Sequence, residues 1–327
     1  MLPVAIDAMG GDHAPSQILD GARLAADAGI PVVLVGRGAD LGDGRGLPVI
    51  EASQVIAMDD DPAKSVRTMK DSSLVRAAEA CRDGRASAFL SAGNTGATMA
   101  SALLRMGRIK GVARPAIATP IPVIGSTPTV LLDAGANAEC TPQFLVQFAQ
   151  MGAVYASRRY GIENPRVGLL SIGEEDGKGN PLAKETNELL RAGAAGAGVN
   201  FIGNVEGRDI MSDRVDVVVT DGFTGNVVLK TLEGGMKFFA GKVFEALVSS
   251  PEAKEAAKVL LPALMPLAEA LDPNSYGGAM LLGIDGVCII SHGSSNATAV
   301  FNAAKVARDM VEADLVGALR VAIRPNG

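Results

Sequence analysis

Short runs of β-branched and other apolar residues alternate along this chain with longer segments rich in alanine and leucine. Runs with apolar residues at nearly every position are typical of strands in a parallel sheet that helices cover on both faces. The alternation therefore predicts an α/β fold, a three-layer α/β/α sandwich with a mostly parallel sheet. The eight runs are PVAIDA (3–8), PVVLVG (31–36), SAFLSAG (87–93), TPTVLLDAG (127–135), RVGLLSIG (166–173), VNFIGN (199–204), VDVVVTDG (215–222) and VCIISHG (287–293).

The length and composition fit one large globular unit. The chain has 327 residues, and its hydrophobic fraction of 48% is enough for a large buried core. We expect residues 1–327 to form a single domain with two lobes around a cleft. We find neither a tandem repeat nor a low-complexity linker in the sequence.

Charge and aromatic content argue against a nucleic acid partner. The net charge is -6, no block of lysine and arginine is present, and aromatic residues make up only 4% of the chain. Nucleic acid sites need a basic surface, and single-strand binding uses aromatic platforms. Nucleic acid is therefore not expected as a partner.

The cysteines and the start of the sequence indicate the cellular compartment of the protein. Cys81, Cys140 and Cys288 are far apart and include no CxxC pair, so neither a disulfide framework nor a zinc site is indicated. The sequence starts with an expected strand rather than a signal peptide, and no apolar run approaches the roughly 20 residues of a spanning helix. We therefore expect a cytoplasmic protein.

Small and polar residues follow six of the expected strands. Parallel strands end at the same edge of a sheet, where loops that lead into helices present free N–H groups to an anion. Each loop alone is also ordinary turn chemistry, but the six together favour a crevice for an oxyanion. The loops are AMGGDHAP (8–15), SAGNTGA (91–97), LDAGAN (132–137), GNVEGRD (203–209), TDGFTGN (220–226) and SHGSSN (291–296).

Several common motifs are incomplete. The glycines after PVVLVG have the spacing GxGxxxG and indicate a surface turn rather than a dinucleotide site. The Walker spacing, the GxSxG elbow and the HExxH zinc helix are missing. Cys140 is expected at the start of a helix, where the helix dipole lowers a thiol pKa, but the role of a small buried residue is favoured.

Ten sequence blocks in order resemble the phosphate acyltransferase family of bacterial phospholipid synthesis, PlsX, over nearly the whole chain. Two features depart from the family pattern: Arg67–Met69 is less basic than usual before KDSS, and Ser171 stands where asparagine is common. The blocks are IDAMGGDHAP (6–15), KDSS (70–73), SAGNTGA (91–97), RPA (114–116), LDAGAN (132–137), GLLSIGEEDGKGN (168–180), GNVEGRD (203–209), DGFTGN (221–226), YGGA (276–279) and HGSSN (292–296).

The resemblance implies a fold like that of isocitrate and isopropylmalate dehydrogenases, a homodimer, and no nicotinamide or metal requirement. It implies acyl carrier protein, as a fatty acyl thioester, and inorganic phosphate as substrates, with acyl phosphate as product. It also implies peripheral contact with the inner face of the membrane, where a glycerol-3-phosphate acyltransferase receives the product. A basic docking patch for the acidic carrier protein is expected near Arg105, Arg108, Lys110 and Arg114.

Attack of phosphate on a thioester needs an anion site, polarisation of the carbonyl and stabilisation of the leaving thiolate, and it needs no covalent nucleophile. Lys184, one turn into the helix after EEDGKGN, is the leading catalytic candidate; the alternative is a solvated lysine. His13 and His292 lie in strand-end loops and either orient phosphate, protonate sulfur or form structural hydrogen bonds. Asn226 is the fourth catalytic candidate.

A second group of residues is expected to bind phosphate through backbone N–H, hydroxyl and amide groups. Helix capping uses the same donors and is the alternative for the asparagines and threonines. The aspartates Asp7, Asp133 and Asp221 are assigned to positioning loop amides, with a divalent metal site as a less favoured alternative. The expected binding residues are Gly10, Gly11, Asn94, Thr95, Gly96, Asp133, Asn137, Asp221, Thr224 and Gly225.

Two amphipathic stretches at about 236–272 predict a helical hairpin with its turn near Ser249 to Pro251. The hairpin is either a dimer interface or core, or a projecting tip that enters the bilayer surface. Few lysines flank it, so membrane attachment would depend on apolar insertion. The expected tip residues are Val259, Leu260, Leu261 and Leu264, with Met265 beside them.

Three rival functions remain open. A dehydrogenase on the same scaffold is disfavoured because no persuasive adenosine-binding motif or acidic metal cluster is present. A phosphotransacetylase that acts on acyl-coenzyme A shares the chemistry. A non-catalytic membrane scaffold for lipid synthesis would leave the polar strand-end loops without an evident use.

Overall fold

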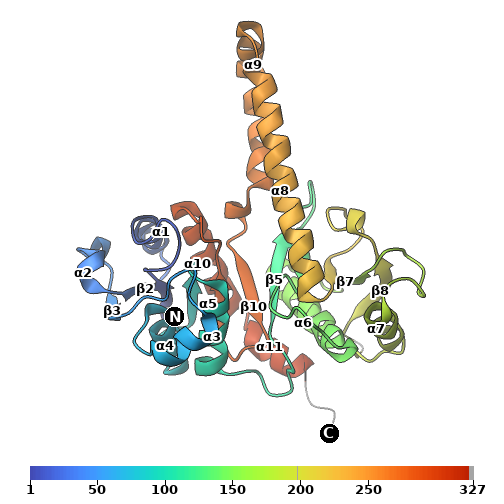
Figure 1. Cartoon of the computed structure of the whole chain (residues 1–327), viewed down its shortest axis with the longest axis horizontal. Helices are drawn as coiled ribbons and strands as arrows, with labels where there is room; N and C mark the ends of the chain where they lie inside the picture. Colours follow the sequence, from blue (N-terminus) through green and yellow to red (C-terminus); the bar gives the residue numbers. More distant parts are fainter. Residues whose placement is uncertain (197, 324–327) are drawn as a thin grey trace.

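The computed structural model describes residues 1–196 and 198–323, which form one eleven-stranded sheet with helices on both faces (Figure 1). The strands are β1 (Val4–Asp7), β2 (Val32–Gly36), β3 (Val49–Glu51), β4 (Ala88–Ser91), β5 (Ala116–Ile121), β6 (Thr129–Leu132), β7 (Arg166–Leu170), β8 (Asn200–Val205), β9 (Val217–Val219), β10 (Ala279–Leu282) and β11 (Val287–Ile290). The helices are α1 (Ser16–Asp27), α2 (Gly38–Leu41), α3 (Pro62–Thr68), α4 (Ser73–Arg82), α5 (Thr95–Ser101), α6 (Pro142–Tyr160), α7 (Pro181–Arg191), α8 (Gly222–Leu247), α9 (Pro251–Leu271), α10 (Ala297–Glu312) and α11 (Leu315–Ala322).

The strand order across the sheet is β3-β2-β1-β4-β11-β10-β5-β6-β9-β7-β8. Pairing is parallel on both sides of the centre, and antiparallel where β10 meets β11 and β5 and where β5 meets β6. The mostly parallel α/β sheet expected from the sequence is confirmed, and all eight expected strands are present. The sequence interpretation missed β3, β5 and β10, and the GxGxxxG segment after β2 includes the one-turn helix α2 rather than only a turn.

The sheet lies between two helical layers, as the continuous apolar strands require. One face packs against α1, α6, α7, α10 and α11, where Tyr155 and Phe148 are fully buried. The other face packs against α4 and α5 on the first half of the sheet, and against the first turns of α8 on the second half. The core therefore runs along both faces of the sheet, and the strand ends remain free for a site.

Helices α8 and α9 form a hairpin that leaves the sheet and projects from the body of the protein (Figure 1). The predicted hairpin is present, but its first helix begins at Gly222, well before the expected start at 236, because Asp221 caps α8 directly at the end of β9. None of the helices among the described residues is long and apolar enough to cross a membrane.

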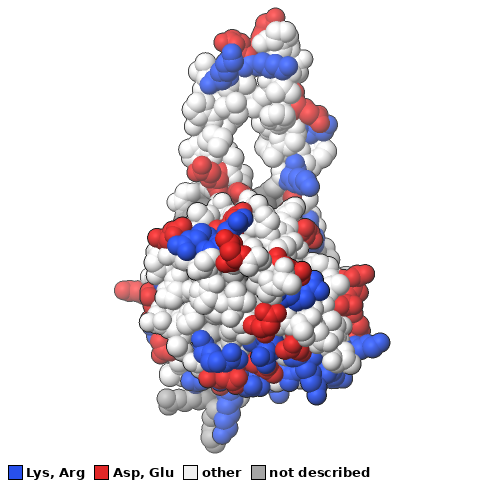
Figure 2. Space-filling view, turned by 90° about the vertical axis from the view of Figure 1, so that its left-hand side faces the viewer, with Lys and Arg blue, Asp and Glu red and all other residues white. Residues whose placement is uncertain are grey.

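The expected tip residues lie on the shaft of this hairpin rather than at its turn. Val259 is eight residues into α9, about 12 Å from the first residue of that helix. Val259 is 80% exposed, Leu260 and Leu261 are also exposed, and Leu264 is half-buried. The charged pairs Lys242–Glu245 and Lys258–Glu255 lie along the same hairpin, and Figure 2 shows charged side chains at its outer end.

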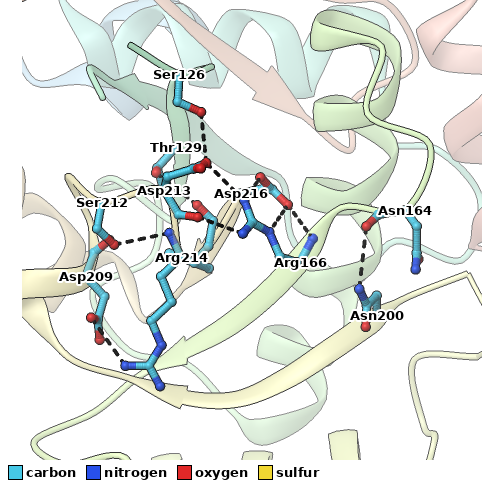
Figure 3. Close-up of polar contacts among 11 residues, drawn as sticks. Ser126, Thr129, Asn164, Arg166, Asn200, Asp209, Ser212, Asp213, Arg214 and Asp216 are labelled. Carbon is cyan, nitrogen blue, oxygen red and sulfur yellow. Dashed lines mark hydrogen bonds and ion pairs between the residues drawn. The ribbon is translucent and has the colours of Figure 1, made fainter. Parts of the chain in front are cut away.

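An ion-pair network stabilises the β7–β9 end of the sheet (Figure 3). Arg166 donates from Nε and Nη2 to the two carboxylate oxygens of Asp216, at 3.0 and 2.9 Å, and its backbone N–H donates to the same carboxylate. Its Nη1 donates to the backbone oxygen of Asp213. Burial alone would raise the pKa of Asp216, but the hydrogen bonds from Arg166 lower it below its ordinary value.

Replacing Arg166 with alanine is expected to reduce the free energy of unfolding at neutral pH by about 1–3 kcal/mol, because Asp216 loses charged donors at a buried position. A lowered folded pKa contributes stability above the unfolded pKa of about 4, and this contribution is lost as the pH falls through the folded pKa. The difference between wild type and Arg166→Ala should therefore shrink on acidification, as measured by urea unfolding.

The matched control is Arg23→Ala, which removes an ion pair with Asp27 in which both side chains are exposed. This variant should change the free energy of unfolding much less than Arg166→Ala does. An equal loss in the two variants, or a loss from Arg166→Ala that does not depend on pH, would contradict the role of Asp216.

Candidate functional site

The loops after β1, β4 and β11 lie side by side and are joined by hydrogen bonds. The buried Asp7 carboxylate accepts from the hydroxyl of Ser91 at 2.7 Å, and that hydroxyl accepts from the N–H of Gly93 at 2.9 Å. The N–H of Asp12 donates to the backbone oxygen of Gly293 at 2.8 Å. Burial raises the pKa of Asp7, and the hydrogen bonds oppose this shift. Asp7 therefore positions the loops, as expected.

The loop after β6 folds around the carboxylate of Asp133, which is fully buried. This carboxylate accepts hydrogen bonds from four backbone N–H groups and from the side-chain amide of Asn137, at 2.7–3.2 Å. Asn137 also accepts, through its backbone oxygen, from the N–H of Gly222 at the start of α8. Asp133 and Asn137 thus shape the loop, and Asp133 has no need of a phosphate or metal partner.

The start of α8 packs directly against this loop. A Cβ at Gly225 would lie well inside van der Waals contact with the backbone oxygen of Asp133, so only glycine fits here. Asp221 caps the helix and accepts from both the N–H and the hydroxyl of Thr224, at 2.9 and 2.8 Å. The loops after β6 and β9 therefore form one unit. They lie at the opposite edge of the sheet from the loops after β1, β4 and β11, because β6 and β9 run antiparallel to β11, so the expectation that all six loops share one edge is wrong.

The side-chain amide of Asn94 is engaged by hydrogen bonds within the protein. Its Nδ2 donates to the backbone oxygens of residues 57, 58 and 60, and its Oδ1 caps α5 by accepting from the N–H of Ala97 at 3.0 Å. The hydroxyl of Thr224 is likewise used by Asp221. For these two side chains the capping alternative explains the contacts, which leaves Thr95 and Asn226 as the side chains that face the space between the loops.

A cavity of about 230 Å³ lies where α8 crosses the sheet beside β5 and β10. Its lining combines polar residues from the ends of β4 and β11 with apolar and some polar residues of β5 and α8. The polar lining includes Thr95, Asn226, Tyr276, Ser291, His292 and Ser295. The apolar lining includes Ile117, Ile121, Leu229, Leu232, Met236 and Leu271.

The structure defines the hydrogen bonding of two polar side chains in the cavity, His292 and Ser291. Nδ1 of His292 lies 3.3 Å from the N–H of Ser294, which can only donate, so the neutral imidazole carries its proton on Nε2. The same Nδ1 lies 2.8 Å from the hydroxyl of Ser294. Ser291 is 4% exposed, and its hydroxyl has no hydrogen-bond partner within residues 1–196 and 198–323. The cavity thus presents donors that no protein group uses.

The structure brings together only part of the predicted site. His292, Asn226 and Thr95 line the cavity. The other predicted residues of the neighbouring loops and helix starts lie outside the lining: Gly96, Asp133, Asn137, Asp221, Thr224 and Gly225. Gly10, Gly11 and His13 lie in the adjoining loop after β1, outside the lining. The sequence interpretation missed Ser291, Ser295, Tyr276 and the apolar positions of β5, for which the alternation of Ile117, Thr119 and Ile121 was an available signal.

Lys184 does not line this cavity. It is exposed on the first turn of α7, as expected for a position after EEDGKGN, but α7 follows β7, which is three strands from β5 in the sheet. Figure 1 shows α7 at the far end of the sheet from β10. The sequence places Lys184 one turn into the helix after EEDGKGN, as observed, but it does not give the order of the strands in the sheet, so Lys184 was grouped with the other candidates.

Two further expectations are corrected. The GNVEGRD loop does not join the cavity; its Arg208 and Asp209 belong to an ion-pair cluster with Glu174 and Arg214, part of which appears in Figure 3. Cys140 precedes α6 rather than opening it, and burial raises the pKa of its thiol to about 11. Across the described ranges, no group of three His, Cys, Asp or Glu side chains has an arrangement that could hold a metal ion.

Sequence comparison relates this chain to a protein family and to named relatives. A family model described as "Fatty acid synthesis protein" matches residues 2–317. The chain is 49% identical to a phosphate acyltransferase of Elusimicrobium minutum (strain Pei191), over 97% of this chain and 94% of the relative.

Solved structures share the fold at low identity. A phosphotransacetylase from Streptococcus pyogenes is 15% identical with a TM-score of 0.63, covering 95% of this chain and 94% of that one. A 4-hydroxythreonine-4-phosphate dehydrogenase from Klebsiella pneumoniae is 13% identical with a TM-score of 0.51, covering 95% and 98%. These likenesses confirm the dehydrogenase-like α/β fold, and the matches over nearly the whole sequence show that the chain belongs to the phosphate acyltransferase family.

Proposed function

We propose that this protein transfers a fatty acyl group from the thioester of acyl carrier protein to inorganic phosphate. The observation that carries the proposal is the cavity, whose lining combines hydroxyl, amide and imidazole groups with apolar side chains of β5 and α8. Acyl phosphate likewise combines a charged head with an apolar chain. The relatives named phosphate acyltransferase support the same reaction.

Phosphate binds in the polar part of the cavity at the ends of β4 and β11, near the start of α10. Helix starts carry free N–H groups and a partial positive charge, and both favour an anion. Thr95, Asn226 and Ser295 add uncharged polar groups around the same space. The buried carboxylates of Asp7 and Asp133 are already engaged by hydroxyl and N–H donors, so they do not repel the anion as free carboxylates would.

The reaction is a direct displacement. An oxygen of hydrogen phosphate attacks the thioester carbonyl carbon, the C–O bond forms and the C–S bond breaks. The proton of hydrogen phosphate ends on the carrier thiolate, which gives acyl phosphate and free thiol. His292 donates a hydrogen bond from Nε2–H to the leaving sulfur, and the proton of hydrogen phosphate passes directly to the thiolate. A cysteine nucleophile is not needed, and burial raises the pKa of the Cys140 thiol to about 11, which opposes formation of a thiolate.

The proposed partners follow from this reaction. Acyl carrier protein and phosphate are the substrates, and a membrane glycerol-3-phosphate acyltransferase receives the product. The protein acts in the cytoplasm at the inner face of the membrane. Acyl-coenzyme A is the alternative donor, which the phosphotransacetylase neighbours favour through their fold alone.

The hairpin supports two further proposals. We propose that the exposed apolar side chains of its shaft, Val259 and Leu260 among them, form a homodimer interface with a second copy of the chain. We also propose that the outer end touches the bilayer surface, where Phe244 is 62% exposed beside Lys242. Membrane attachment is then peripheral and shallow.

Purified protein is expected to release free thiol from palmitoyl carrier protein only when phosphate is present, with acyl phosphate trapped by hydroxylamine. His292→Ala should lower kcat by about 10²-fold, because the leaving thiolate loses a hydrogen-bond donor. Lys184→Ala is the matched comparison and should remain close to wild type, since Lys184 lies outside the cavity.

The outcomes of this assay distinguish the proposed reaction from the alternative functions. Release from acyl-coenzyme A but not from the carrier thioester would replace the carrier with coenzyme A. No release from either donor would favour the scaffold. A stable acyl-enzyme that survives denaturation would reject direct displacement.

Val259→Glu is expected to weaken the dimer by at least tenfold in Kd, because a charge would enter an apolar interface, as measured by sedimentation. The control is Val321→Glu on α11, the same substitution at an exposed valine on the body of the protein. Liposome flotation of the same variants tests the membrane proposal. A dimer unaffected by Val259→Glu would reject the shaft interface.

A further inference from the structure

One ion pair belongs to the lining of the cavity. Lys230 and Glu233 both lie on α8, and 2.8 Å separates Nζ of the lysine from Oε2 of the glutamate. Within the described part of the chain, Lys230 is the one lysine or arginine in the lining, and Glu233 is the one aspartate or glutamate. An anion that enters the cavity therefore meets a single positive side chain, which a carboxylate already holds.

The helix places this lysine beside a residue of the proposed site. Asn226 and Lys230 are four residues apart on α8, so they share one face of the helix, about 6 Å apart along its axis. Glu233 follows three residues later on the same face. Gly225 packs against the backbone oxygen of Asp133 and holds the helix to the body directly before this row of polar side chains. Lys230 thus belongs to a fixed part of α8.

The ion pair can be exchanged for another partner. The Lys230 side chain is 54% exposed and that of Glu233 is 27% exposed. Water screens pairs of this kind, so they contribute little to stability and are readily broken. Among the described residues, Nζ donates one hydrogen bond, to Glu233, whereas an ammonium group has three donors. An anion can therefore bind Lys230 beside Glu233 or in its place.

We propose that Lys230 binds the phosphate substrate through Nζ, and that Glu233 competes with phosphate for this ammonium group. The inference rests on the proposed function, because it names the cation that binds the substrate of that reaction. The flexible stem of the lysine lets the ammonium leave Glu233 when phosphate enters. The uncharged polar groups of the cavity then supply the remaining hydrogen bonds to the anion.

Lys230→Met removes the charge and keeps an unbranched side chain of similar size. With palmitoyl carrier protein as donor, this variant should raise the KM for phosphate by about tenfold, because the anion loses its charged donor. The KM for the carrier thioester should not change. Lys230→Arg keeps the positive charge and should return the KM for phosphate to within about threefold of the wild type.

Glu233→Gln should have the opposite effect. It is expected to lower the KM for phosphate by about threefold, because a neutral amide competes for the ammonium less than a carboxylate does. A purely structural ion pair would respond in the same direction to the loss of either partner. The opposite signs therefore distinguish phosphate binding from a structural role.

The matched control is Lys258→Met, which breaks an ion pair of the same spacing on α9. Lys258 and Glu255 are three residues apart, 2.7 Å separates their charged groups, and both lie outside the cavity lining. This variant should leave the KM for phosphate unchanged. Circular dichroism checks that each variant is folded, and Lys230→Gln takes the place of Lys230→Met if the methionine variant does not fold.

Titration of each protein with inorganic phosphate, followed by phosphorus NMR, measures binding without turnover. An unchanged KM for phosphate in Lys230→Met, or an equal rise in Lys258→Met, would overturn the role of Lys230. A rise in the KM for the carrier thioester alone would do the same. Absence of turnover with every thioester, together with phosphate binding that Lys230→Met weakens, would reject the reaction and keep the phosphate site.

Discussion

The antiparallel pairing of β10 with β5 and β11 joins two parallel half-sheets into one. Without it, the strands from β3 to β4 and those from β6 to β8 would have no common hydrogen-bonded edge. The cavity lies over this junction, with loops of the first half on one side and loops of the second half on the other. The site therefore exists only because strands far apart in the sequence pair at the centre of the sheet, at a loop-closure cost that the core must offset.

The site also depends on the hydrogen bonds that engage the carboxylates beside it. Asp7, Asp133 and Asp221 all end strands beside the cavity, and each one accepts hydrogen bonds from nearby amides or hydroxyls. These hydrogen bonds order the loops and occupy the carboxylate oxygens with donors. The polar lining that remains consists of uncharged donors, one histidine and the ion pair of Lys230 with Glu233, so the field that an entering anion first meets comes from helix starts.

Sequence periodicity was sufficient for the strands buried in parallel pairs, because their apolar runs are continuous. It was insufficient for β5 and β10, whose strand character comes from each other rather than from local propensity. Pro120 lies in β5 beyond residues 116–118, which pair with β10, so its missing N–H leaves that ladder intact. The loops that carry His292 and Asn226 could be recognised from the sequence, because each follows a continuous apolar strand. The place of Lys184 relative to these loops depends on the strand order, which the sequence does not state.

One helix connects the cavity with the outer end of the hairpin. Helix α8 has 26 residues, a length of about 39 Å, and carries Asn226 in its first turns and Phe244 in its last. Its closest approach to the body is at Gly225, where the backbone oxygen of Asp133 leaves no room for a side chain. The lining of the cavity and the outer end of the hairpin are therefore parts of one continuous helix that packs tightly against the body at Gly225.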